Sequence, residues 1–160
     1  MPPRLVLLDN TVLTNFALVG RPDFVLDLWG TASATTPEVM REYQVGVTSR
    51  GLPAGIWDTL IQLTPNFVEQ DFADRLPPKL GSGERTSLGI AVHRQGLFAC
   101  DDAEARREAQ RFGLAVTGSI GILVLNVRQG RLTRAEANAL LDEMIVLGYR
   151  SPVPKLDDLL

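Results

Sequence analysis

Two apolar segments of the chain end directly in carboxylates. Residues 5–8 lead into Asp9, and residues 97–100 lead into Asp101 and Asp102. Unbroken apolar runs of this length are typical of strands covered on both faces of a parallel sheet, and such sheets place their sites beyond the carboxyl ends of the strands. Each acid could also serve only as the N-cap of the helix expected after it. A site at the sheet edge and a set of helix caps are the two open interpretations.

Two further acids, Glu38 and Glu84, lie in the first turns of expected helices. Glu38 follows Thr36 and Pro37, which are favourable residues for a helix start. Glu84 follows the glycine-rich segment 81–83. An acid in a first turn stabilises the helix dipole by about 0.3–1 kcal/mol, so either glutamate alone could be structural. The joint occurrence of these acids at strand ends and in the first turns of helices favours a shared site.

A cluster of four carboxylates is suited to a divalent metal. Mg²⁺ and Mn²⁺ prefer oxygen ligands, and Mg²⁺ commonly uses one or two protein carboxylates together with waters and substrate phosphate. Two such ions about 4 Å apart could activate water and stabilise the leaving oxygen of a phosphodiester. The residues themselves therefore indicate metal-dependent chemistry on a phosphate ester.

Alternating strands and helices position these acids. The series strand 97–100, helix 103–112, strand 114–117 and helix 120–129 is typical of an α/β fold with a parallel sheet. The remaining helices are expected at 11–19, 22–29, from Thr36 up to a loop at 46–53, at 54–60, partly within 65–78, after Gly81 and at 133–148, and further short strands at 31–35 and 61–63. We predict one domain over residues 1–150 and a C-terminal tail over 151–160.

Composition narrows the class of protein. The chain has 160 residues with 45% hydrophobic and 22% charged content, which are values of a globular domain. No apolar run is long enough to span a membrane, and a single Cys100 without a leader sequence predicts a cytoplasmic protein. The net charge of −3 disfavours a large basic surface. Of the 16 basic residues, all except Lys79 and Lys155 are arginine. Arginine favours planar contacts to phosphate or carboxylate.

Three other chemistries are disfavoured. His93 is the only histidine and has no second soft ligand nearby, which argues against zinc or a catalytic triad. The segment 81–83 lacks the Lys-Ser or Lys-Thr ending of a phosphate-binding loop. A receiver-like domain phosphorylated on Asp9 would need a lysine at a strand end, and neither lysine is there.

Cys100 is expected to be a buried strand residue.

In the order and spacing of its motifs, the chain resembles a PIN domain, the metal-dependent nuclease fold that includes VapC-type toxins. The resemblance is closest to a stand-alone prokaryotic branch in which a Gly-x-Gly-Glu turn supplies the third acid. It implies a three-layer α/β/α sandwich around a central parallel sheet. The motifs that carry it are Leu8–Leu13, Pro37–Val39, Gly83–Arg85 with its helix, Ala99–Asp102 and Thr117–Leu123.

Transferred by motif, the resemblance implies a set of catalytic acids and supporting residues. The catalytic acids are Asp9, Glu38, Glu84 and Asp102, and the metal ligands are Asp9, Glu84, Asp102 and Asp101. The family often has a hydroxyl residue two places before its last acid, and Cys100 departs from that pattern, so the choice between Asp101 and Asp102 stays open; we favour Asp102. Thr11 and Ser119 match small polar positions that could orient waters or ligands.

The activity implied by the resemblance is hydrolysis of RNA with Mg²⁺ or Mn²⁺, plausibly as the toxin of a type II toxin-antitoxin pair. The expected partners are RNA, a small antitoxin protein and a second copy in a homodimer. Arg85 and Arg41 each lie within a turn of a proposed acid and are candidates for phosphate contacts, with surface ion pairs as their alternative role. The alternative function is a catalytically inactive PIN-like module that binds RNA or protein.

Overall fold

Five parallel strands form the centre of the molecule. The computed structural model describes residues 2–160 and places the strands in the order β3-β2-β1-β4-β5. Their bounds are Val6–Leu8 for β1, Ser33–Thr35 for β2, Ile61–Gln62 for β3, Leu97–Ala99 for β4 and Val116–Thr117 for β5. The central strand β1 pairs with β2 on one side and β4 on the other. The order therefore reverses between β1 and β4, which is where parallel sheets commonly hold their sites.

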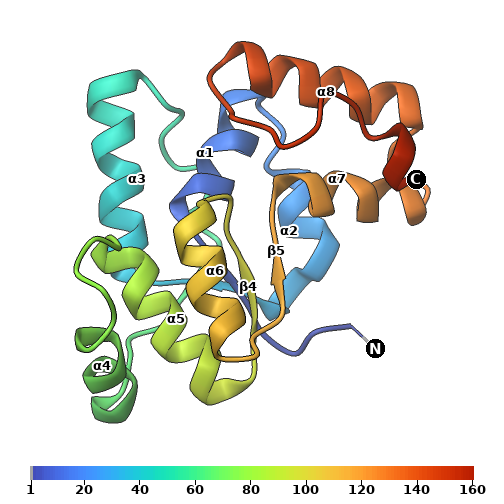
Figure 1. The fold of residues 1–160 in the computed structure, drawn as a ribbon. Coiled ribbons are helices and arrows are strands. Elements are labelled where there is room, and N and C mark those ends of the chain that lie inside the picture. The colour runs from blue at the N-terminus through green and yellow to red at the C-terminus, as the bar shows by residue number, and fades with distance from the viewer. Residues whose placement is uncertain (1) are drawn as a thin grey trace.

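Helices cover both faces of the sheet and confirm the predicted three-layer α/β/α architecture (Figure 1). Their bounds are Asn10–Leu18 for α1, Asp23–Trp29 for α2, Pro37–Arg50 for α3, Phe67–Asp74 for α4, Ser82–Arg94 for α5, Ala103–Arg111 for α6, Ser119–Arg128 for α7 and Arg134–Val146 for α8. Within residues 2–160, no helix is long and apolar enough to cross a membrane.

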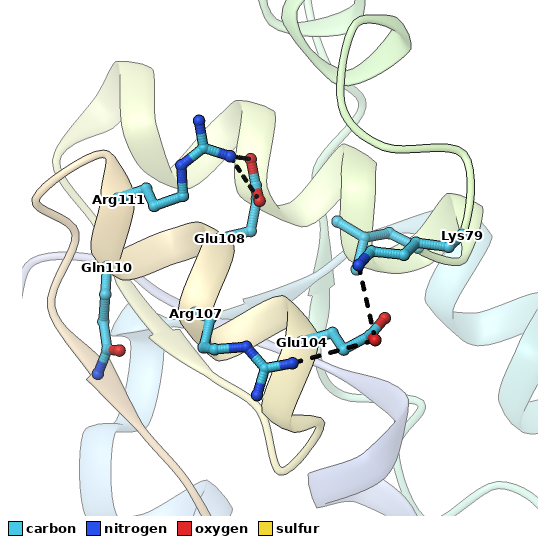
Figure 2. A pocket seen from close by; sticks show the side chains of 7 residues that line it. Lys79, Glu104, Arg107, Glu108, Gln110 and Arg111 are labelled. Carbon is cyan, nitrogen blue, oxygen red and sulfur yellow. Dashed lines mark hydrogen bonds and ion pairs between the residues drawn. The ribbon is translucent and has the colours of Figure 1, made fainter.

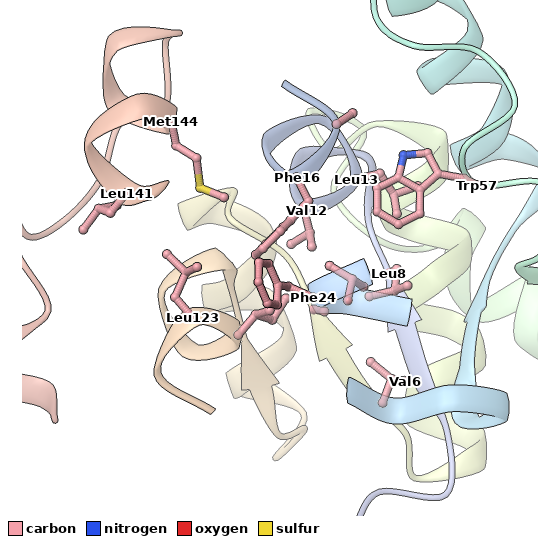
Figure 3. Close-up of a cluster of buried hydrophobic side chains, with 14 of the residues drawn as sticks. Val6, Leu8, Val12, Leu13, Phe16, Phe24, Trp57, Leu123, Leu141 and Met144 are labelled. Atoms are coloured by element: carbon pink, nitrogen blue, oxygen red, sulfur yellow. The ribbon is translucent and has the colours of Figure 1, made fainter. Parts of the chain in front are cut away.

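Alternate residues of the short strands feed two separate cores. Val6 and Leu8 of β1 belong to the larger core, which Figure 3 shows between the sheet and helices α1, α7 and α8. Leu7, which points the other way, belongs to a smaller core with Leu88 and Ile90 of α5. Because β1 is buried on both faces, its residues are apolar without alternation. The strand thereby delivers Asp9 to the edge of the sheet from a rigid base.

The predicted loop at 46–53 was wrong for residues 46–50 and confirmed for 51–53, and the predicted helix at 54–60 was wrong. Helix α3 continues through Gly46 to Arg50, and residues 54–60 form turns. A Cβ at Gly46 would lie 2.6 Å from Cδ1 of Leu52, so glycine here lets Leu52 fold back against the helix. A glycine among polar residues is typical of a loop, but Gly46 serves close packing within the helix.

The segment 151–160 packs against helix α8. Leu156 is fully buried, and its backbone N–H donates to Asn138 Oδ1 at 2.9 Å. The chain ends beside α7 and α8 (Figure 1), where Arg128 donates to the carbonyl of Leu159. The division of the chain at residue 150 stays a prediction.

Candidate active site

The two strand-end acids meet where the strand order reverses. Asp9 follows β1 and Asp101 follows Cys100 after β4, and the backbone N–H of Asp9 donates to the carbonyl of Ala99 at 2.9 Å. Asp9 is the N-cap of α1 and Asp102 is the N-cap of α6. The capping role is therefore confirmed for Asp9 and Asp102, and because the same carboxylates lie at the sheet edge, capping does not exclude a site there.

Asp9 is buried without a basic partner. Its side chain is 1% exposed, and its Oδ2 accepts hydrogen bonds from the Thr11 backbone N–H at 3.2 Å and the Thr11 hydroxyl at 2.8 Å. Its other oxygen, Oδ1, is buried with no hydrogen-bond partner among residues 2–160. Burial raises the pKa of Asp9 above its usual value, and the hydrogen bonds from Thr11 only partly oppose that shift. An additional ligand could therefore be accommodated at Oδ1.

Glu84 lies among other acids. It is the third residue of α5, and its Oε2 accepts a hydrogen bond from the Gly81 N–H at 3.3 Å. The pKa of Glu84 is raised to about 8, first by burial and then by the negative charges of Asp9 and Asp102. Carboxylates brought from β1, α5 and the β4–α6 junction thus act on one another, as carboxylates that share a metal would do in the absence of the metal.

Glu42, which the sequence reasoning missed, belongs to the same group of acids. It lies one turn after Glu38 on α3, and its Oε1 accepts a hydrogen bond from the Gly83 N–H at 3.0 Å. Burial is the largest cause of its raised pKa, and the charges of Asp9 and Glu38 add to it. The available signal was its i,i+4 spacing from Glu38, which puts both acids on one helix face.

Glu38 faces a basic neighbour instead. Its Oε1 accepts from Arg41 Nη2 at 3.1 Å, while its Oε2 is buried without a partner. Arg85 lines the same hollow of about 260 Å³ between α3, α4 and α5, and its Nε is also buried without a partner. Arg41 and Arg85 therefore line the same hollow as Glu38. Glu38 and Arg41 both precede Glu42 in α3. Their contact with a phosphate stays a prediction.

The adjacent acids Asp101 and Asp102 have different surroundings. Asp101 accepts hydrogen bonds from the Ser119 N–H at 2.8 Å, from Asn15 Nδ2 at 2.9 Å and from the Tyr149 hydroxyl at 3.4 Å. Within residues 2–160, the carboxylate of Asp102 accepts only the capping bond from the Ala105 N–H, at 2.9 Å. Asp102 is also the one whose charge raises the pKa of Glu84. The geometry favours Asp102 as the fourth acid and Asp101 as a support for the loop.

Small side chains connect the two strand ends. The Thr11 hydroxyl donates to Asp9 and accepts from the Asp101 N–H at 2.9 Å, while the Ser119 hydroxyl donates to Asp101. The Cys100 thiol donates to Asp9 Oδ2 at 3.4 Å and accepts from the Asp102 N–H at 3.3 Å. Cys100 is fully buried as expected, and burial raises the pKa of its thiol. The thiol thus connects the Asp9 carboxylate with the Asp102 N–H.

His93 lies away from these acids. Its Nδ1 is 2.6 Å from the carbonyl of Gly89, and its ring packs edge-on against Phe72. This histidine is a packing residue of the α4–α5 pair.

The donor set fits a hard divalent cation. Four carboxylates, those of Asp9, Glu42, Glu84 and Asp102, act electrostatically on at least one other member of the group, and one oxygen of Asp9 lacks a partner. Among residues 2–160, no three acidic, histidine or cysteine side chains are already gathered tightly enough to form a complete metal site. Oxygen-only donors without a nearby lysine are nevertheless the ligand type that Mg²⁺ and Mn²⁺ use.

One comparison identifies the family to which this α/β/α fold, with carboxylates at its switch point, belongs. The family model described as a PIN domain matches residues 5–160. The chain therefore belongs to the PIN-domain family, whose members are generally nucleases. No curated protein and no solved structure was found to match the chain.

Proposed function

We propose that the protein is a divalent-metal-dependent endoribonuclease. The observation that carries the proposal is the group of Asp9, Glu42, Glu84 and Asp102, in which burial raises the pKa of Asp9, and burial together with neighbouring negative charge raises the pKa of both glutamates. Such a group lowers the stability of the metal-free fold, and a bound cation would relieve that cost. The group lies where a parallel sheet offers its site.

The proposed ligands are Asp9, Glu84 and Asp102, with Glu42 in the place that the sequence reasoning gave to Glu38. A bound Mg²⁺ or Mn²⁺ would activate water toward phosphorus and neutralise charge on the leaving oxygen. Thr11 holds Asp9 through two hydrogen bonds, which fixes the orientation of the unpartnered oxygen. Asp101 and Ser119 hold the β4–α6 loop, so that Asp102 is presented from a fixed helix start.

The finer assignments rest on the resemblance of the motifs to VapC-type toxins. We include in the proposal a toxin role in the cytoplasm, a small antitoxin partner and a homodimer. Arg41 and Arg85, which line one hollow with Glu38, remain candidates for contacts to the backbone phosphate. The inactive binding module is less consistent with the site, because a module without catalysis has no need to keep mutually repelling buried acids.

Cleavage of RNA by the wild-type protein and the Asp9→Asn variant tests the proposed function. We expect Mn²⁺-dependent or Mg²⁺-dependent cleavage by the wild type that EDTA abolishes. Asp9→Asn should lower the rate by more than about 100-fold, since even residues that only support metal ligands are worth 10- to 100-fold. The variant should unfold at an equal or higher temperature, because one buried charge is removed. Cleavage that survives in the folded variant would overturn the assignment, and RNA binding without any cleavage would instead support the inactive module.

A further inference from the structure

Two adjoining hollows extend away from the acids. The smaller, of about 310 Å³, reaches Asp102 and Arg50, and the larger, of about 600 Å³, reaches Arg106. Asp101, Tyr149 and Arg150 line both hollows. Because these residues are shared, the two hollows adjoin, and together they are called the groove, which begins at the proposed ligand Asp102.

The groove carries arginines that lack carboxylate partners. Within residues 2–160, Arg50, Arg106 and Arg150 make no ion pair, although eight other basic side chains do. Arg106 donates to the carbonyl of Cys100 at 2.9 Å, which fixes it to the floor of the groove. In a chain with net charge −3, unneutralised cations gathered along one groove indicate an anionic ligand.

A third hollow, of about 520 Å³, shows the contrasting case (Figure 2). There Lys79 pairs with Glu104 at 3.6 Å, and Arg111 pairs with Glu108 at 3.0 Å. Arg107, which lines this hollow and also the larger hollow of the groove, reaches Glu104 at 4.0 Å. The charges of the third hollow are largely balanced, so the groove beside the acids is the better surface for a polyanion.

We propose that this groove binds a single strand of RNA, with Arg50 and Arg150 contacting backbone phosphates on the side of the acids. The inference rests on the proposed nuclease function and names the path of its substrate. A single strand is favoured because its unpaired bases can stack on an aromatic side chain, whereas the bases of a duplex are stacked and paired within the helix. The phenol of Tyr149 is held by Asp101, which places an aromatic ring between the two hollows for stacking with a base.

Binding can be measured separately from cleavage. The probe is a fluorescein-labelled 12-nucleotide RNA, and binding to Asp9→Asn protein is followed by fluorescence anisotropy at several salt concentrations. The test variant adds Arg50→Ala and Arg150→Ala. The matched control adds Arg4→Ala and Arg134→Ala, which remove the same charge from exposed arginines without ion pairs, one before β1 and the other at the opposite end of α8 from Arg150.

We expect the test variant to bind about tenfold more weakly or worse, and its slope of log K against log salt to fall by about 1.4, which corresponds to two lost phosphate contacts on a single strand. The control should bind within about twofold of the parent, and an RNA duplex should bind more weakly than the single strand. Equal losses in test and control, no detectable binding by the parent, or equal binding of the duplex would overturn the groove. These results are independent of whether the wild type cleaves RNA, so failure of the groove is distinguishable from failure of the nuclease assignment.

Discussion

Asp9 and Glu69 are both 1% exposed, yet their surroundings affect their ionisation in opposite directions. Glu69 accepts hydrogen bonds from Arg94 Nε and Nη2, each at 2.8 Å, and from the Asn66 N–H at 2.9 Å. The Arg94 guanidinium holds the pKa of Glu69 below its usual value. Asp9 has no such cation and keeps one oxygen without a partner, and burial raises its pKa.

The difference separates a carboxylate that stabilises the fold from carboxylates that await a ligand. Glu69 fastens α4 to α5, where the two helices approach so closely that a Cβ at Gly89 would lie 2.5 Å from the Glu69 carbonyl oxygen. The buried carboxylate that joins α4 to α5 therefore has an arginine partner. At the switch point of the sheet it places Asp9 and Glu84 together without one, and the cost in folding stability indicates a function there.

Removing the bridge is expected to have the largest effect on stability. Glu69→Ala should lower the free energy of unfolding by about 2 kcal/mol, less than the cost for a fully buried pair because the Arg94 side chain is 38% exposed. Urea unfolding measures this change. The control is Asp71→Ala, which breaks an exposed pair with Arg75 and should cost under about 0.5 kcal/mol. Equal losses in the two variants would show that Glu69 is no more structural than a surface acid.

Neutralising an acid of the site should have a smaller and opposite effect. Without metal, Glu84→Gln should raise the free energy of unfolding at pH 8 by about 1 kcal/mol. This is far less than the pKa shift of Glu84 would give for a fully buried group, because the side chain is only partly buried. Glutamine keeps an oxygen that can accept the hydrogen bond from Gly81. A loss of stability in this variant at pH 8 would mean that Glu84 is held by favourable contacts instead of opposed by its neighbours.

The opposite pKa shifts of Glu84 and Glu69 predict opposite dependences of folding stability on pH. Glu84 has a folded-state pKa raised to about 8, so its contribution to stability is full below the unfolded-state value near 4.5 and is lost as the pH rises through about 8. Glu69 has a lowered pKa, so its contribution is present above the unfolded-state value and is lost as the pH falls through the folded-state value. Urea unfolding of Glu84→Gln from pH 5 to 8 should therefore show a gain over wild type that grows with pH.

The fold was largely predictable from the sequence because the signals were local. Apolar runs bounded by turns marked β1 and β4, and the capping box of Thr133 and Glu136 marked the start of α8. Gly46 misled because a glycine inside a helix and a glycine in a loop have the same local pattern. Only the position of Leu52, six residues later, decides between them.

The site was predictable only in part because its members meet through tertiary packing. Asp9, Glu84 and Asp102 were recognisable from their places at strand ends and helix starts. Glu42 lies in the second turn of α3, where neither the dipole nor a cap distinguishes it, and its role depends on α3 packing beside Gly83 of α5. Asn15 was missed for the same reason, since its contact with Asp101 spans 86 residues.

Calorimetric titration with Mn²⁺ of the wild type and of the Asp9→Asn, Glu42→Gln and Glu38→Gln variants tests the central claim most directly. We predict saturable binding by the wild type, no detectable binding by Asp9→Asn, and affinity reduced by about tenfold or more in Glu42→Gln, as expected for loss of a ligand. Glu38→Gln should bind within about twofold of the wild type, because Glu38 pairs with Arg41. Undiminished binding by Asp9→Asn, or an equal loss in Glu38→Gln and Glu42→Gln, would contradict the proposed set of metal ligands.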